Sequence, residues 1–153
     1  MSKETNIAAQ ERFAEAVNTG NFDIFDEVVA PDALDHDPAP DQGRGPEGFK
    51  TFFGMMRNAF PDLEVTPEHM TATDEDVALA YTVTGTHQGE FQGVEPTGKS
   101  ISVRGCQIAR FEDGKLAERW GSSDELGILQ QLEAVNIQDG EQDKGLIDRL
   151  TGR

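Results

Sequence analysis

The chain contains very few of the residues that serve redox and metal chemistry. Its 153 residues include one cysteine, one tryptophan, one tyrosine and three histidines. A lone cysteine cannot form an internal disulfide, and the histidines are widely separated with no i, i+4 pair, so we expect no metal site. Because Cys106 lies in an alternating, strand-like segment, we expect it to be a buried structural thiol and not a nucleophile.

Long apolar runs and an excess of basic residues are also missing. No run of about 18 apolar residues occurs, and the first residues do not have the pattern of a signal peptide, so the expected location is the cytoplasm. The 29 acidic residues outnumber the 13 basic ones and give a formal net charge of −16. Such a charge repels nucleic acids and anionic membranes, which disfavours both as partners. Acidic residues spread over the whole chain are compatible with a high-salt habitat, which is a hypothesis about habitat and not about function.

The first part of the chain has apolar residues at helical spacing. Such spacing occurs over residues 5–19, again over residues 22–29 up to Pro31, and most clearly over residues 49–60. One face of the third segment collects its large apolar side chains, Phe49, Phe52, Phe53, Met56 and Phe60. Residues 35–46 are rich in proline and glycine and predict an irregular but ordered loop before that helix.

After Pro61 the hydrophobic period falls to two, which is typical of half-buried strands. Strands are expected near 63–65 and over 77–87, 101–111 and 116–122. Residues 88–99 predict a long hairpin connection, and Asp113-Gly114 predicts a tight hairpin turn. Strands that follow helices in this way indicate an α+β fold, and no glycine-rich phosphate loop is present.

The chain is expected to form one domain over residues 1–135. A last helix should run from Asp124 to about Val135, with leucines on one side. The polar tail over residues 136–153 is expected to dock only loosely.

Several polar side chains could converge on a small-molecule pocket inside a curved sheet. His36 precedes the Pro/Gly loop and is either a group near the pocket entrance or a surface imidazole. His87 continues the strand face that carries Tyr81, so it is either part of a pocket wall or a satisfied histidine at a strand end. Gln107 can donate and accept, which suits a carbonyl ligand, although ordinary bonding between strands is the alternative.

Two roles are open for Asp124, the acidic residue nearest the end of the hairpin. Asp is a favoured helix N-cap, worth about 1 kcal/mol, and Asp124 directly precedes an apolar-periodic segment. At the dry end of a cavity the same carboxylate could take a proton from carbon. Arg104 is expected to be structural or solvated unless it meets a carboxylate or a ligand anion.

Short motifs that are individually weak occur together over most of residues 5–133: His36-Asp37-Pro38, Phe60-Pro61-Asp62, Gly85-Thr86-His87, Pro96-Thr97-Gly98, Val103-Arg104-Gly105, Phe111 to Lys115, Glu118-Arg119-Trp120 and Asp124 to Gln131. Together they resemble the SnoaL-like polyketide cyclase family of the nuclear transport factor 2-like superfamily. The resemblance implies a cone-shaped α+β barrel, with a strongly bent antiparallel sheet wrapped around helices and a homodimer formed through the sheet. It also implies an aldol ring closure without metal or cofactor, carried out by an Asp near the strand Trp. In this chain Gly121 follows Trp120, and the nearest Asp is Asp124.

We therefore expect an enzyme that removes an acidic α-proton from a hydrophobic, carbonyl-containing small molecule, in a cyclisation or an isomerisation and without a cofactor. The expected catalytic residues are Asp124 and His87. The expected substrate contacts are His36, Gln107, Trp120, Arg104, Tyr81, Phe53 and Phe60. Two alternatives remain open: a protein that binds a small ligand without turnover, which Gly121 favours, and a water-activating epoxide hydrolase or dehydratase.

Overall fold

The computed structural model describes residues 2–135, and the tail predicted for residues 136–153 lies outside this range. Along the described residues the elements follow in the order α1 (Lys3–Thr19), α2 (Ile24–Val28), β1 (Val29–Asp35), α3 (Gly45–Ala59), β2 (Glu64–Ala72), β3 (Asp76–Thr86), β4 (Ser100–Glu112), β5 (Lys115–Ser123) and α4 (Glu125–Gln131). None of these helices has the length and apolar character needed to cross a membrane.

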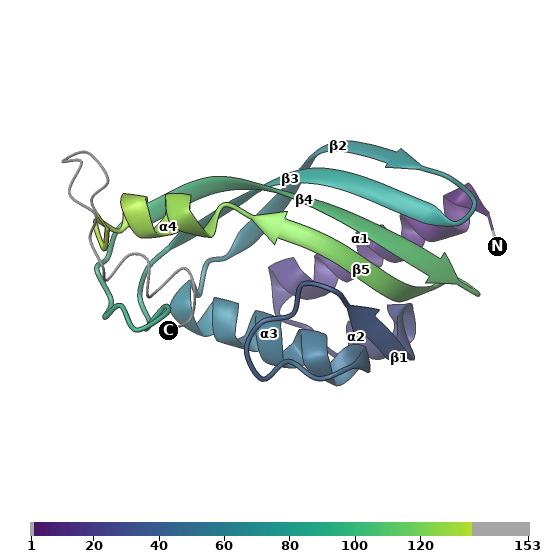
Figure 1. Ribbon diagram of the computed structural model, residues 1–153, viewed down its shortest axis with the longest axis horizontal. Helices are drawn as coiled ribbons and strands as arrows, with labels where there is room; N and C mark the ends of the chain where they lie inside the picture. The colour runs from purple at the N-terminus through teal and green to yellow at the C-terminus, as the bar shows by residue number, and fades with distance from the viewer. Residues whose placement is uncertain (1, 136–153) are drawn as a thin grey trace.

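The strands form one sheet in the order β1-β5-β4-β3-β2. The sheet arches over α1 and α3, and α4 lies at one end of it (Figure 1). This arrangement confirms the predicted α+β fold. The sheet is mixed, however, because β1 pairs with β5 in parallel whereas the other neighbours are antiparallel.

Strand β1 was missed because Pro31 looks like a helix stop. The structure places Pro31 inside β1, which is an edge strand, and proline is tolerated at a sheet edge because one side of that strand needs no ladder hydrogen bond. The expectation of a wholly antiparallel sheet with four strands was therefore wrong at this edge.

The core between the helices and the concave face of the sheet is built around phenylalanine. The ring of Phe13 on α1 lies 4.9 Å from that of Phe25 and 5.3 Å from that of Phe49 on α3, measured between ring centroids. Arg57 also joins α3 to the end of α1, since its Nη1 donates to the backbone oxygens of Val17 and Asn18. These contacts hold the two helices at a fixed spacing under the sheet.

The hairpin of β4 and β5 contains a bulge that decides which side chains face inward. Asp113 and Gly114 both have positive φ, 50° and 76°, as the predicted tight turn requires. Phe111 pairs with Leu116, but Arg110 pairs with Glu118, so one extra residue, Ala117, lies in β5. A one-residue shift moves every later side chain to the opposite face.

Cys106 is exposed, which corrects the expectation of a buried thiol. The concave face of β4 carries Gln107 and its alternate neighbours, so Cys106 lies on the outer face. Ile108 and Trp120 lie on the same outer face, where they pair across the strands and are 49% and 38% exposed.

Candidate functional site

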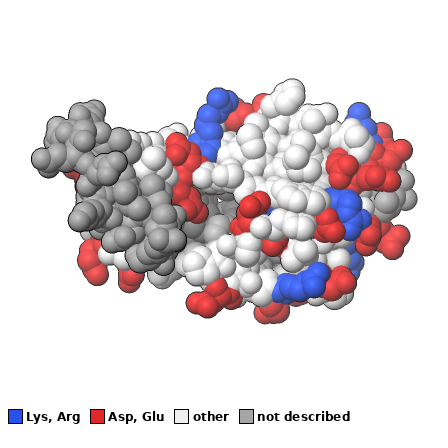
Figure 2. Space-filling view, in the orientation of Figure 1, with Lys and Arg blue, Asp and Glu red and all other residues white. Residues whose placement is uncertain are grey.

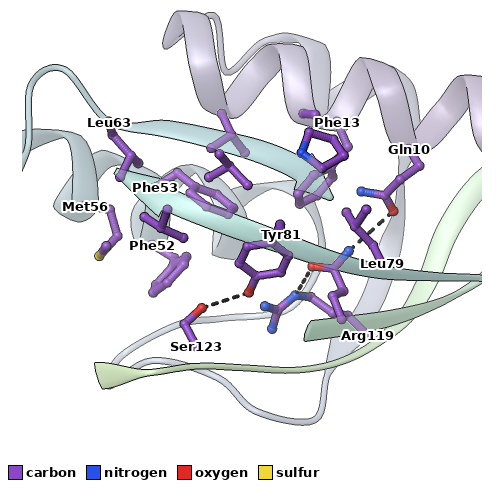
Figure 3. Close-up of a pocket in the computed structure, with 16 residues that line it drawn as sticks. Gln10, Phe13, Phe52, Phe53, Met56, Leu63, Leu79, Tyr81, Arg119 and Ser123 are labelled. Carbon is purple, nitrogen blue, oxygen red and sulfur yellow. Dashed lines mark hydrogen bonds between the residues drawn. The ribbon is translucent and has the colours of Figure 1, made fainter. Parts of the chain in front are cut away.

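A pocket lies between the concave face of the sheet and helices α1 and α3 (Figure 3). The space between its walls is about 650 Å³ when the part that opens to solvent is counted. Most of its wall is apolar and comes from Phe13, Ala14, Val17, Phe52, Phe53, Met56, Leu63, Val65, Pro67, Leu79 and Val83. Figure 2 shows a small hollow between β5 and α3, with acidic side chains beside it.

The polar part of the wall is built around a buried arginine. Arg119 Nη1 lies 3.1 Å from each carboxylate oxygen of Asp35 at the end of β1, and Nε donates to Gln107 Oε1 at 2.7 Å. Gln107 Nε2 in turn donates to Gln10 Oε1 on α1 at 3.4 Å. These bonds connect β1, β5, β4 and α1 at one end of the pocket, and Figure 3 shows Arg119 and Gln10 there.

A second polar contact joins two hydroxyl groups, since Tyr81 Oη and Ser123 Oγ are 2.8 Å apart. Tyr81, Gly105 and Ser123 occupy paired positions on three neighbouring strands. A Cβ at Gly105 would lie only 2.5 Å from the Tyr81 ring, so the glycine lets the ring cross β4 and reach Ser123. The phenol is thereby held at the pocket wall.

Gly121 makes room for the side chain of Arg119, as Gly105 does for the ring of Tyr81. The inner face of β5 carries Arg119, Gly121 and Ser123, and a Cβ at Gly121 would lie 2.6 Å from Arg119 Nη2 and 2.8 Å from Cζ. The guanidinium therefore occupies the space that a side chain at position 121 would fill. In this chain the position directly after Trp120 supplies room for a cation and not an acid.

Of the residues predicted as substrate contacts, Tyr81, Gln107 and Phe53 line the pocket. Phe60 does not, because its fully buried ring packs 5.5 Å from His87 and 5.5 Å from Phe91. The structure thus brings together three of the predicted contacts and places Phe60 in the core beside them.

His87 is fully buried but lies outside the pocket lining. Its Nδ1 accepts the backbone N–H of Thr97 at 3.1 Å, which anchors the connection between β3 and β4. Because Nδ1 accepts in this bond, the ring proton belongs on Nε2, and within residues 2–135 that nitrogen has no hydrogen-bond partner. His87 is therefore a histidine at a strand end with one nitrogen bonded and one without a partner among the described residues, and its place outside the pocket lining gives no support to a proton-handling role.

Three other predicted contacts lie on the outer face of the sheet. His36 stacks on Trp120 with a centroid distance of 4.6 Å and an interplanar angle of 6°, and its Nε2 is 3.6 Å from Glu118 Oε2. Arg104 is exposed on the same side of β4. None of these side chains lines the pocket.

Of the two roles that the sequence left open for Asp124, the structure shows the helix N-cap. Asp124 is the N-cap of α4, and its Oδ1 accepts the backbone N–H of Gly127 at 2.8 Å. Its neighbour Ser123 lines the pocket, whereas Asp124 is exposed and does not. The geometry therefore gives no support to Asp124 as the acid/base.

Gln10, Arg119 and Ser123 were not among the predicted site residues. A signal for Arg119 was present, because an inward arginine needs a carboxylate and Asp35 ends the strand beside it. Within residues 2–135 no group of three or more His, Cys, Asp and Glu side chains is suited to hold a metal ion.

The fold and the pocket define a small α+β protein that can enclose an apolar ligand with one polar end. The chain belongs to the SnoaL-like polyketide cyclase family, whose model matches residues 7–132. It is therefore a polyketide cyclase-like protein, as the sequence motifs suggested.

Two relatives share about a third of their residues with the chain. It is 31% identical over 135 residues to the aklanonic acid methyl ester cyclase DnrD of Streptomyces peucetius, covering 84% of this chain and 90% of that protein. It is 32% identical over 121 residues to the nogalonic acid methyl ester cyclase of Streptomyces nogalater, covering 76% and 89%.

Solved structures have the same fold. TsrD from Streptomyces laurentii superposes with a TM-score of 0.81 at 26% identity, over 88% of this chain and 99% of that one. Wild-type IdmH from Streptomyces antibioticus gives a TM-score of 0.74 at 30% identity, over 84% and 98%.

Proposed function

We propose that the pocket binds a hydrophobic, carbonyl-containing small molecule and that the protein carries out cofactor-free acid/base chemistry on it, either a ring closure or an isomerisation. The observation that supports this most is the composition of the wall, which is apolar over most of its area and carries Arg119, Gln107 and Gln10 at one end. An apolar wall with a few fixed polar groups is typical of sites that orient small ligands. The two relatives are named as cyclases of aklanonic acid methyl ester and nogalonic acid methyl ester, and an ester contains a carbonyl group.

The arrangement assigns distinct roles to the polar side chains. Arg119 is fixed by Asp35 and Gln107, so it can stabilise negative charge on a carbonyl oxygen without moving during the reaction. In a ring closure, the α-proton passes to solvent water, the resulting enolate carbon attacks a second carbonyl carbon, and the alkoxide that forms takes a proton. Tyr81 is suited to donate that proton, and Ser123 can hydrogen-bond the phenolate that remains until solvent returns the proton.

A second function, binding without turnover, is favoured by one specific observation. In the part of the chain that the structure describes, the residues that line the pocket include no Asp, Glu or His, so none of them is a conventional base for a carbon acid. A protein that only sequesters a polyketide-like ligand needs the apolar wall and the donors but no base.

An assay with aklanonic acid methyl ester distinguishes catalysis from binding without turnover. We expect the wild-type protein to consume the ester and Tyr81→Phe to lower kcat by about 10²-fold, the lower end for a lost general acid, with little change in affinity. Ser122→Ala is the matched control, because Ser122 lies on the outer face of the same strand. Saturable binding without consumption would favour the binding function, and an unchanged kcat in Tyr81→Phe would remove Tyr81 from the mechanism.

We also propose that two copies associate through the outer face of the sheet. Ile108 and Trp120 are paired across β4 and β5 and form an exposed apolar patch there, which a second copy could cover. Cys106 lies next to this patch and provides a chemical probe of it.

A further inference from the structure

We propose that the polar end of the pocket is an oxyanion site, which binds the ionised oxygen of an enol or phenol against Arg119 Nη2 in preference to the neutral hydroxyl. This inference deepens the proposed function and uses the same pocket, but it requires no turnover. It concerns the form of the ligand that binds, and it assigns Gly121 as the residue that makes this form fit.

The first support is the unused donor of Arg119. Its Nε and Nη1 are occupied by Gln107 and Asp35, whereas Nη2 has no acceptor among the described residues. The residue is 9% exposed and lines the pocket. Within residues 2–135 the fully enclosed polar side-chain atoms without a partner are Asn6 Oδ1 and His87 Nε2. Nη2 is not one of them, so this nitrogen is accessible and can donate to a ligand oxygen as its partner.

The second support is the charge around that donor. Among residues 2–135, the lining contains no carboxylate that would repel an oxyanion, and Arg119 is its only permanently charged group. Asp35 offsets part of the arginine charge, but its own oxygens also accept from Gln42 Nε2 and from the backbone N–H of Asp37, each at 3.0 Å. The apolar wall reduces screening by water, so a ligand oxygen at Nη2 would still meet a strong donor.

The third support is the glycine at position 121. Because a Cβ there would lie 2.6 Å from Nη2, any side chain would force the guanidinium out of its present place. A carboxylate at this position would lie against the guanidinium and replace the ligand anion as its partner. The combination of Arg119 with Gly121 is therefore suited to a negatively charged ligand oxygen, because no acidic side chain on the inner face of β5 competes with the ligand for the guanidinium.

The ionisation itself is a simple proton exchange. A neutral enol or phenol that enters the pocket loses its O–H proton to solvent water, and the electron pair stays on the oxygen that Arg119 holds. An opposite charge within about 4–6 Å lowers the pKa of an acid by about 1–3 units, and we expect the lower end because Asp35 remains paired with Arg119. This corresponds to about tenfold tighter binding of the ionised form.

The test uses 4-nitrophenol as the probe and the full chain as the protein. The phenol and phenolate forms differ in visible absorption, so a pH titration with and without saturating protein gives the pKa of the free and the bound probe. We expect the bound probe to titrate about one unit lower in the wild type. Gly121→Ala and Arg119→Gln should lose most of this shift, and Ser122→Ala should retain it.

Several results would overturn the inference. The wild-type measurement alone is decisive, because a bound probe with an unchanged or raised pKa would mean that the pocket prefers the neutral form. Failure of the probe to bind at millimolar concentration would also overturn the inference, because an oxyanion site should hold the phenolate. An undiminished shift in folded Gly121→Ala would remove the role of Gly121. A phenolate preference without consumption of the ester would refute only the enzymatic function, whereas consumption without the preference would refute only this inference.

Discussion

Arg119, which lines the pocket, and Asp35, which holds it from the end of β1, should be a strongly coupled pair of side chains. Their side chains are 11% and 6% exposed, and their bond joins β5 to the end of β1. Removing one partner of a buried ion pair costs about 3–5 kcal/mol, because the other charge is left without compensation. We expect Arg119→Met to lower the free energy of unfolding by about 3 kcal/mol, the lower end of that range, because Asp35 keeps its bonds to Gln42 and Asp37.

The reverse change should cost less. Asp35→Asn removes the charge but keeps an oxygen that can accept from Arg119, so we expect a loss of about 2 kcal/mol, typical of a hydrogen bond to a charged group. Combining Asp35→Asn with Arg119→Met should cost less than the sum of the single changes by about 1–2 kcal/mol, because the double variant no longer buries an unpaired charge.

Urea unfolding followed by circular dichroism measures these values. A small domain has about 5–15 kcal/mol of stability, so the single variants should remain folded and have measurable midpoints. A loss below about 1 kcal/mol for Arg119→Met, or strictly additive single and double variants, would show that the pair is not coupled as described.

Three further predictions concern other parts of the fold. Asp124→Ala should lower the free energy of unfolding by about 1 kcal/mol, whereas Asp124→Asn keeps a good N-cap and should retain both stability and turnover; loss of turnover in a stable Asp124→Asn would restore Asp124 as the acid/base. Trp120→Glu should convert a dimer seen in sedimentation into a monomer and speed the alkylation of Cys106; a monomeric wild-type protein would contradict this. The N–H and hydroxyl of Thr86 hold the pKa of Asp62 below its usual range. The folded-state pKa is thus lower than the unfolded one, so this contribution is present above about pH 4 and is lost as the pH falls further; unfolding of Asp62→Asn and the wild type should differ at neutral pH and converge in acid, and a constant difference would refute the assignment.

The sequence was sufficient for most elements because their signals are local. Apolar residues at helical spacing gave α1 and α3, and the strict alternation of residues 77–87 and 101–111 gave β3 and β4. The turn at Asp113-Gly114 also formed as predicted, since both of its residues have positive φ. Each of these patterns is fixed by neighbours in the chain.

The site was harder to predict because a single bulge changes the facing of β5. A regular two-residue hairpin would pair Trp120 with Gln107 and turn both inward, as the expectation of Trp120 in the pocket wall requires. The extra residue Ala117 shifts the register, so that Trp120 pairs with Ile108 on the outer face and Arg119 turns inward. Both Leu116 and Ala117 are buried, which shows the interruption of the alternation. That interruption is weak in the sequence, because alanine is compatible with either face.

Contacts between residues far apart in the sequence were the second feature that the sequence could not predict. The partners of Arg119 come from β1 and β4, and the distance along the chain from Asp35 to Arg119 is 84 residues. The predicted roles of His87 and Asp124 rested on their positions at strand ends. The actual bonds to Thr97 and Gly127 are local ones that compete with any role in the pocket.

The most direct test of the pocket is a crystal structure of the protein with aklanonic acid methyl ester bound. We expect the ring system to lie against Phe53 and Leu79, with a carbonyl or enolate oxygen within hydrogen-bonding distance of Arg119 Nη2. A ligand bound on the outer face of the sheet, or one that enters the pocket with its oxygens directed away from Arg119 and Gln107, would contradict the account.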